Sequence, residues 1–428
     1  MGRPRNRKQQ RRPVGRRDFL RRSGAAMLAA AAVPLLQACG GGGGGDNGNS
    51  GDTSQAGATG FLHGVASGDP LSNAVILWTR VTAPGNGPMN VDYFVATDPG
   101  MNALVKTGRV STDASRDYTV KVDADGLQPN TTYYYRFSAA SVMSPIGRTK
   151  TLPVGDTGRL RLAVVSCASL AHGYFNAYRR IAERADLDLV VHLGDYIYEY
   201  GSGDYGDVRS YEPANEILTL SDYRTRHAQY KRDIDLQEVH RQHAMVAIWD
   251  DHEFANDAWS GGAGNHTEGA EGTWAARVAA ALQAYYEWMP VRVVDPANLR
   301  KNNRSFALGN LVDLIMLEER VNARAQQINR NVISFGNFTQ TGDYLDPARQ
   351  ILGTEEEGWL ASCAARLQGG SWSGRVSCSP SSSPWPAWWR MAAAPFSILT
   401  SGTAISPPAT ASTTSSRAAP ARRRSTTW

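Results

Sequence analysis

Three apolar segments, each followed at once by polar residues, constrain the fold of this chain more than any other feature. They cover residues 160–165, 187–193 and 244–249. These mostly apolar strands, interrupted only by Arg161, Asp188 and His192, are typical of a sheet that is covered on both faces. Helical patterns lie at 174–185, 223–228 and 272–288. This order predicts an α/β (α+β) sandwich domain over residues 159–360.

Each apolar segment ends in residues that are able to bind a metal ion. Ser166-Cys167 follows the first segment, Gly194–Glu199 the second and Asp250–Glu253 the third. In open α/β sheets, ligands bind beyond the carboxyl ends of the strands. We therefore expect the three polar clusters to form one site.

The residue types of the first two clusters favour a transition metal. Cys167, Asp195 and Tyr198 offer a thiolate, a carboxylate and a phenolate. This set suits ferric iron better than Mg²⁺ alone. The alternative for Cys167 and Tyr198 is simple packing in the core.

The third cluster offers harder ligands and a candidate acid. Asp251 and Asn256 present oxygen atoms, which suit Ca²⁺ or Mg²⁺. The two carboxylate oxygens of Asp195 allow that residue to bridge two ions. His252 is placed to protonate a leaving group, and a structural role is its alternative.

Residues 60–153 differ from the rest, because short strands of alternating polarity are separated by turn residues. The expected strands are 75–79, 91–95, 118–122 and 132–137. This spacing predicts a small all-β sandwich domain. Its segment Leu127–Tyr134 resembles the corner of fibronectin-type (Ig-like) sandwiches.

Residues 1–38 are predicted to be a signal peptide. Gly15–Arg21 contains the pair Arg16 and Arg17 and resembles the twin-arginine export pattern. The apolar stretch Ala25–Leu36 is too short to span a membrane. A basic disordered tail is the alternative interpretation.

A lipid attachment site is predicted directly after this stretch. Leu36–Cys39, followed by a run of glycines, resembles a bacterial lipobox. Lipid on Cys39 would leave residues 39–59 as a flexible tether. The alternative is an ordinary signal peptide with a chance cysteine. Either way, we expect the protein in the periplasm or cell envelope.

Charge and cysteine content exclude two classes of protein. The net charge of +5 comes from the ends, because residues 1–22 hold ten Lys or Arg and residues 358–428 hold seven Arg. The body between them is acidic, which argues against nucleic acid as a partner. Four cysteines exclude a disulfide-rich scaffold.

The composition changes after Glu357. Residues 358–428 contain no Asp, Glu, Lys, His or Tyr, and no long window has a helical or strand period. We interpret residues 361–428 as the product of a reading-frame shift near residue 361. A natural low-complexity tail is the alternative. Both ends of the chain are expected to be disordered.

The strings around the predicted site resemble the bacterial alkaline phosphatase D (PhoD) family. They are His63–Pro70, Val75–Arg80, Ser166-Cys167, His192–Glu199 and Trp249–Trp259. They stand in the family's order, and the resemblance runs from about 61 to 360. Gly194-Asp195 and Asp251–Glu253 also resemble motifs of calcineurin-like metallophosphoesterases. The resemblance implies an exported phosphomonoesterase or phosphodiesterase. We expect a monomer whose partners are a phosphoester substrate, the twin-arginine machinery and, at most, a membrane through its lipid.

The resemblance also implies the occupants of the site. Fe³⁺ would be bound by Cys167, Asp195 and Tyr198, and Ca²⁺ by Asp195, Asp251 and Asn256, with His252 as the catalytic residue. Arg320 is a weaker candidate for substrate binding, because Glu319 stands where the family has Thr. The family's closing motif, Gly-Asp-x-His-x-x-Trp, does not occur in the sequence. A non-catalytic remnant is therefore the alternative function.

We predict that export depends on the arginine pair. Changing Arg16 and Arg17 together to Lys should leave precursor in the cytoplasm, because the twin-arginine route recognises this pair. Cell fractionation followed by immunoblotting measures the outcome. Unchanged export of the double Lys variant would contradict the assignment.

Overall fold

The computed structural model describes residues 60–82, 85–328, 346–368 and 375–378. The predicted signal peptide with Arg16 and Arg17, the tether with Cys39, and residues 379–428 of the predicted tail lie outside the described residues. Within the described ranges, no helix is long and apolar enough to cross a membrane.

A six-stranded sheet forms the centre of the described fold. In spatial order, its strands are β5 (Thr119–Ala124), β2 (Val75–Arg80), β1 (Val65–Gly68), β11 (Ala244–Ala247), β10 (Leu189–His192) and β9 (Leu162–Val165). The four neighbouring strands β1, β11, β10 and β9 run parallel to one another. Strand β2 is antiparallel to both of its neighbours, β1 and β5. The carboxyl ends of β9, β10 and β11 therefore meet at one edge, as the sequence predicted.

Alternation of apolar side chains sorts the two faces of this sheet. Val190, Met245 and Ala247 pack in the core that the helices share. Leu189, Val191 and Val246 pack on the other face, against a second sheet. Because both faces are covered, β10 and β11 are apolar at every position except His192.

Two short 3-10 helices are η1 (Ala114–Arg116) and η2 (Leu170–His172). The helices of the first face are α2 (Asn176–Ala182), α3 (Leu220–Lys231), α4 (Ile234–Gln242) and α5 (Trp274–Trp288). Side chains at their N-termini explain where three of them begin. Thr219 and Asp222 form a capping box at the start of α3, and Asp233 and Thr273 accept hydrogen bonds from the first turns of α4 and α5. Such caps satisfy N–H groups that have no partner within the helix.

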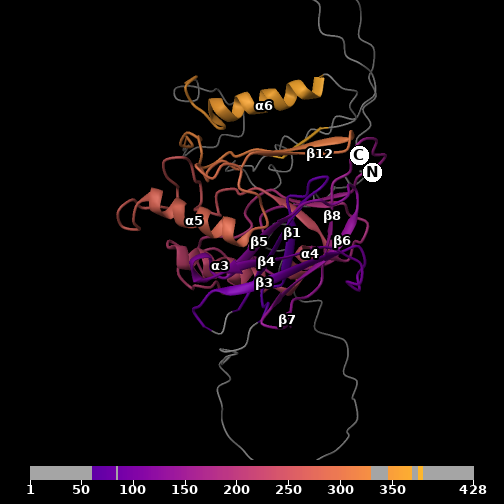
Figure 1. Cartoon of the computed structure of the whole chain (residues 1–428). Helices are drawn as coiled ribbons and strands as arrows, with labels where there is room; N and C mark the ends of the chain where they lie inside the picture. Colours follow the sequence, from indigo (N-terminus) through magenta and orange to yellow (C-terminus); the bar gives the residue numbers. More distant parts are fainter. Residues whose placement is uncertain (1–59, 83–84, 329–345, 369–374, 379–428) are drawn as a thin grey trace, which may run out of the picture. The chain divides into compact units, whose positions relative to one another are not determined.

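The other face is covered by a three-stranded sheet, and one helix packs on the outer side of that sheet. The strands, in spatial order, are β12 (Arg304–Leu308), β13 (Val312–Met316) and β14 (Arg375–Cys378). Helix α6 (Gly353–Gln368) lies along this sheet (Figure 1), where Cys363 and Trp359 pack on Ile315 and Leu317 of the β13 segment. The ordered fold thus continues past residue 361, where we expected the tail to begin.

The strands of residues 60–153 fall into two sheets. The second of these contains β4 (Leu104–Thr112), β3 (Met89–Ala96), β6 (Thr132–Ala139), β7 (Val142–Met143) and β8 (Gly147–Lys150). It shares an apolar core with β1, β2 and β5. However, β1 also pairs with β11, where Ser67 lies opposite Ala244. The sheet therefore continues across the domain boundary that we predicted at residue 153.

Strand β9 differs from the expectation of a strand covered on both faces. It is the last strand of the six-stranded sheet and pairs only with β10 among the described strands. Val164 is exposed, and Leu162, Ala163 and Val165 are half-buried. An apolar run predicts burial of the strand, but it does not distinguish a central strand from an edge strand.

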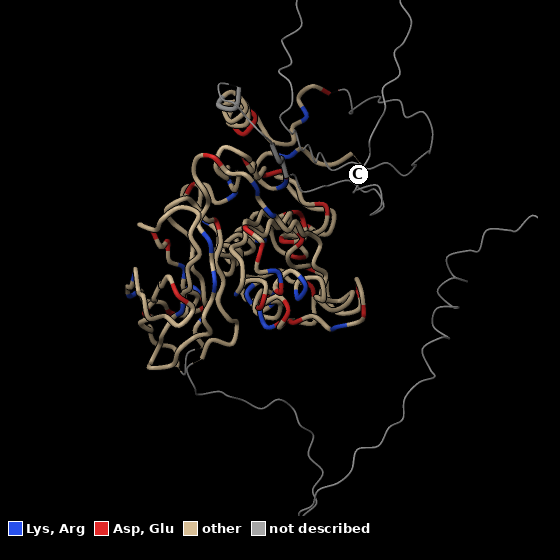
Figure 2. The backbone as a smooth tube through the Cα atoms, turned by 90° about the vertical axis from the view of Figure 1, so that its right-hand side faces the viewer, with Lys and Arg blue, Asp and Glu red and all other residues tan. Residues whose placement is uncertain are grey.

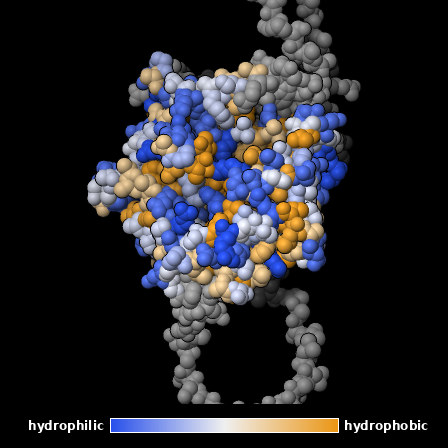
Figure 3. Space-filling view, viewed as in Figure 1, coloured by the Kyte–Doolittle hydropathy of each residue, from blue (hydrophilic) through white to orange (hydrophobic). Residues whose placement is uncertain are grey.

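Charged residues of both signs are mixed over the described backbone (Figure 2). Apolar and hydrophilic residues likewise alternate over the face seen in Figure 3. Nucleic-acid binding requires basic residues gathered on one face or along one element. The interspersed charges of the described body do not have that arrangement.

A buried carboxyl group joins α6 to the segment after β13. Oε1 of Glu356 accepts a hydrogen bond of 2.8 Å from the backbone N–H of Glu318. Burial raises the pKa of Glu356 from 4.5 to about 8, and the nearby carboxylates of Glu318 and Glu319 add to this effect. Between these pH values the native state holds a proton that the unfolded chain has released, so stability falls as the pH rises.

We predict that Glu356→Gln removes this pH dependence. From about pH 5 to about pH 8, the free energy of unfolding of the wild type should fall relative to the variant by up to about 1.4 kcal/mol per pH unit. Urea unfolding across this range measures the difference. Glu357→Gln, at the exposed neighbouring position, should keep the wild-type slope. Equal slopes in all three proteins would contradict the prediction.

Candidate metal centre

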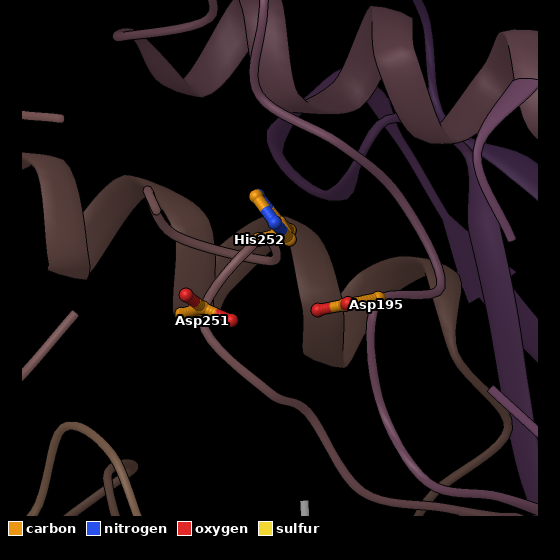
Figure 4. A group of neighbouring side chains, drawn as sticks. All are labelled: Asp195, Asp251 and His252. Atoms are coloured by element: carbon orange, nitrogen blue, oxygen red, sulfur yellow. The ribbon is translucent and has the colours of Figure 1, made fainter. Parts of the chain in front are cut away.

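The loops that follow β10 and β11 bring three predicted site residues together. Asp195, Asp251 and His252 each offer one ligand atom, and these atoms lie within 4.8 Å of one another. In Figure 4, the carboxylate of Asp195 points toward Asp251, and His252 lies beside the two. All three residues are buried. The predicted convergence of the second and third polar clusters is therefore present in the structure.

Tight backbone turns place these residues directly beyond the strands. Asp195 has a φ of 55° and Cys167 a φ of 58°, both in the left-handed region. Gly194 has a φ of 101°, and a Cβ at this position would lie 2.5 Å from the backbone nitrogen of Asp250. Only glycine permits this approach of the two loops.

The carboxylate of Glu253 joins the same two loops. It accepts hydrogen bonds from the backbone N–H groups of Asp195 (3.1 Å), Tyr196 (2.6 Å) and Asp250 (2.8 Å). Glu253 is buried. Its contacts fix the backbone of both loops, so the spacing of Asp195 and Asp251 depends on them.

The first polar cluster lies beside Asp195. The N–H of Cys167 donates to the carbonyl of Gly194 at 3.1 Å, and the N–H of Ala168 donates to the carbonyl of Asp195 at 2.8 Å. Cys167 itself is exposed and is not among the three side chains whose ligand atoms converge. The hydroxyl of Tyr198 donates to Oδ2 of Asp195 at 3.2 Å.

The protein environment alone disfavours negative charge on the side chains of Asp195, Cys167 and Tyr198. Burial raises the pKa of Asp195, and Asp251 adds to the rise. Desolvation of the Cys167 sulfur and the nearby Asp195 raise the pKa of this thiol to about 12. Burial and Asp195 raise the pKa of Tyr198 as well. A bound cation would reverse each of these shifts.

His252 is held by a second buried carboxylate. Its Nδ1 lies 2.7 Å from Oε2 of Glu199. The other carboxylate oxygen, Oε1, accepts hydrogen bonds from Asn256 N–H (2.7 Å) and Asn265 Nδ2 (3.1 Å). Burial opposes protonation of His252, but Glu199, Asp251 and Asp195 outweigh it and raise its pKa well above the usual value.

The loop after His252 is closed by hydrogen bonds of its own. Oδ2 of Asp251 accepts from the N–H of Asp257 at 2.6 Å. Nδ2 of Asn256 donates to Oδ2 of Asp257 at 3.2 Å. Asn256 thus lies one short loop from Asp251, and its side chain is engaged by Asp257.

Arg320 occupies a different place from the one we expected. It is 1% exposed, its Nε donates to Asp250, and its Nη2 lies 3.1 Å from Oδ1 of Asp251. Burial opposes a low pKa at Asp251, but Arg320 and His252 lower it. The guanidinium therefore compensates buried carboxylates, whereas the sequence suggested contact with substrate.

Sequence reasoning missed the roles of Glu199 and Glu253. Both stand inside the strings that carry the family resemblance, one position after Tyr198 and one after His252. In the sequence, their acidic side chains are equally typical of further metal ligands and of ordinary polar loop residues. A buried acid beside strand-end loops often binds backbone N–H groups, but its partners become visible only in the fold.

The donor set fits a metal ion. Oδ1 of Asp195 is buried and has no hydrogen-bond partner among the described residues. Asp251 contributes a second carboxylate, while Cys167 and Tyr198 lie next to Asp195. An unpaired buried carboxylate oxygen is costly, and coordination of a cation removes that cost.

Comparison with known proteins gives one consistent family. Residues 162–373 match the family described as PhoD-like phosphatase, and residues 47–153 match the PhoD-like phosphatase N-terminal domain. Alkaline phosphatase D of Bacillus subtilis (strain 168) is 41% identical over 315 residues, which cover 70% of this chain and 52% of that protein. A solved structure described as PhoD superimposes with a TM-score of 0.67 and 39% identity, covering 74% of this chain and 61% of the other. The chain spans about half the length of the curated relative.

We predict that Arg320 stabilises the site. Replacing it with Met leaves Asp250 and Asp251 buried without their guanidinium and should cost about 3–5 kcal/mol in unfolding free energy. Denaturant unfolding measures the loss. Arg180→Met is the control, because the exposed Arg180–Glu183 pair contributes less than about 1 kcal/mol. Equal losses in the two variants would refute the assigned role.

Proposed function

This chain belongs to the PhoD-like phosphatase family, and from that premise we propose that it is a metal-dependent phosphoester hydrolase. The observation that carries the proposal is the convergence of Asp195, Asp251 and His252 at the carboxyl ends of β10 and β11. Two carboxylates that can hold cations and an imidazole that can donate a proton are the groups that phosphate-ester hydrolysis requires.

We assign the metals according to the chemistry of the donors. Cys167, Asp195 and Tyr198 would hold Fe³⁺, because thiolate and phenolate ligands suit a strongly polarising ion. Asp251 and Asn256 would hold Ca²⁺ through oxygen atoms, with Asp195 shared between the two. When bound, these ions supply positive charge that orients a phosphate group and neutralises charge developing on it.

The protein's own residues would supply proton transfer and positioning. Glu199 holds Nδ1 of His252 at 2.7 Å, which leaves Nε2 as the ring nitrogen that can protonate the departing alcohol oxygen. Glu253 fixes the spacing of the two loops, and Arg320 compensates Asp250 and Asp251 from behind the site. In this proposal His252 transfers the proton, while Glu253 and Arg320 keep the site's loops and carboxylates in position.

Several finer features belong to the same proposal. We assign an export signal to Arg16 and Arg17 and a lipid attachment site to Cys39. With these assignments the enzyme would lie in the periplasm or cell envelope. We also propose that it is a monomer. We assign residues 159–360 to a calcineurin-like metallophosphoesterase core and residues 60–153 to a fibronectin-like (Ig-like) sandwich. The family match reaches residue 373, so we move the proposed frame shift from residue 361 to the residues after 373.

We predict that the full chain, loaded with iron and calcium, hydrolyses a chromogenic aryl phosphate. Asp195→Asn should lower turnover more than about 100-fold, because it removes the shared carboxylate. Release of the aryl alcohol, followed by absorbance, measures the rate. Full activity of Asp195→Asn would contradict the proposed site, and a metal-loaded wild type without activity would contradict the proposed function.

A spectroscopic control separates the iron assignment from the activity. A ferric phenolate absorbs visible light, so Tyr198→Phe should bleach the protein. Tyr200→Phe is the matched control, because Tyr200 stands two positions along the same loop and only Tyr198 donates a hydrogen bond to Asp195. Colour that persists in Tyr198→Phe would reassign the iron ligand.

A further inference from the structure

A cluster of three aromatic rings lies beside the metal centre. The rings of Tyr198 and His252 have centroids 4.3 Å apart and planes inclined by 27°. Tyr205 lies 5.8 Å from Tyr198 and 6.3 Å from His252, inclined by 20° to each, so the three centroids form a triangle. We call Tyr198, His252 and Tyr205 the aromatic cluster. Separations of this size are those of favourable ring–ring contact.

Exposure differs sharply among the rings of this cluster. Tyr198 is 4% exposed and His252 is buried beside Asp251 and Asp195 (Figure 4), whereas Tyr205 is 43% exposed. Tyr205 therefore continues the buried rings of the site to the protein surface. A large aromatic side chain at this place contacts solvent unless another group covers it.

The position of Tyr205 is fixed by close packing of its loop. The next residue, Gly206, has a φ of 92°, and a Cβ there would lie 2.8 Å from the carbonyl oxygen of Ala171. The N–H of Val208 donates to the same carbonyl at 2.9 Å. The ring of Tyr205 also contacts His172 (4.6 Å) and Tyr200 (4.9 Å). The ring is thus held in place before any ligand arrives.

We propose that Tyr205 forms a leaving-group subsite, which stacks a planar aromatic group of the phosphoester substrate. The proposal rests on the hydrolase function proposed above. A phosphoryl group at Asp195 and Asp251 would place its ester oxygen near His252, and the group attached to that oxygen would lie next to the aromatic cluster. Because the planes of the three rings are nearly parallel, a flat ring can stack on the exposed Tyr205, whereas a spherical quaternary ammonium favours rings that face inward around it.

The test compares an aryl with an alkyl ester in the metal-loaded full chain. The measured quantity is the aryl-to-alkyl ratio, which is kcat/KM for phenyl phosphate divided by kcat/KM for glycerol phosphate. The two leaving groups differ in intrinsic reactivity, but this difference is the same for every variant and cancels when the ratio is compared with that of the wild type. Tyr205→Ala should lower the ratio about tenfold, mainly through KM, since a stacked ring contributes this order of affinity. Tyr205→Phe should restore it, because the ring remains.

Tyr174→Ala is the matched control. Tyr174 is a more exposed tyrosine (69%) whose ring contacts Arg209 and is not part of the aromatic cluster. Its removal should leave the aryl-to-alkyl ratio unchanged. An equal fall of the ratio in Tyr174→Ala and Tyr205→Ala would overturn the subsite, because a general surface effect would then explain both.

Binding of non-hydrolysable ligands separates this proposal from the hydrolase function. Calorimetry should show that wild type prefers phenylphosphonate to methylphosphonate and that Tyr205→Ala loses the preference. This result supports the subsite even where neither ester is hydrolysed, an outcome that contradicts only the hydrolase proposal. Hydrolysis of both esters with an unchanged ratio in Tyr205→Ala overturns the subsite. So does the lack of any phenylphosphonate preference, or a stronger Tyr205-dependent preference for phosphocholine.

Discussion

The site depends on one buried carboxylate that binds backbone instead of a cation. Glu253 accepts three N–H groups, two from the loop after β10 and one from the loop after β11. Burial raises its pKa to about 8 and the nearby Asp195 adds to the rise, whereas the hydrogen bonds from the N–H groups of Tyr196 and Asp250 oppose it. The three bonds explain how two acidic loops can lie so close together, at a distance that admits only a glycine at position 194.

The sequence predicted the site better than its surroundings. Apolar runs that end in polar clusters identified the loops, and Asp195, Asp251 and His252 do converge. The strand β1 escaped prediction, because Val65–Gly68 is four residues long and three of these residues are small. Its partner β11 lies far along the chain. A local pattern indicates which face a strand buries, but the choice of neighbour depends on packing between distant segments.

The same limit applies to charged side chains. Arg320 resembled a substrate contact in the sequence, yet it is buried against Asp250 and Asp251. Asp69 accepts hydrogen bonds from Arg292 N–H at 2.7 Å and from Arg304 Nη1 at 2.5 Å. Arg304 also donates to the carbonyl of Ala247 in β11. Residue type indicates the charge, but only the fold shows which charges compensate one another.

The pairing of β1 with β11 has a consequence for how the chain acquires its structure. Ser67 and Gly68 must find Ala244 and Met245, so the central sheet cannot close until the chain through β11 has been synthesised. Contacts between distant segments slow folding, because the intervening chain must be ordered first. Until then, β1 presents an unpaired strand edge, which is prone to association with other chains. The central sheet is therefore complete only when strands from both of the regions that two family descriptions divide have come together.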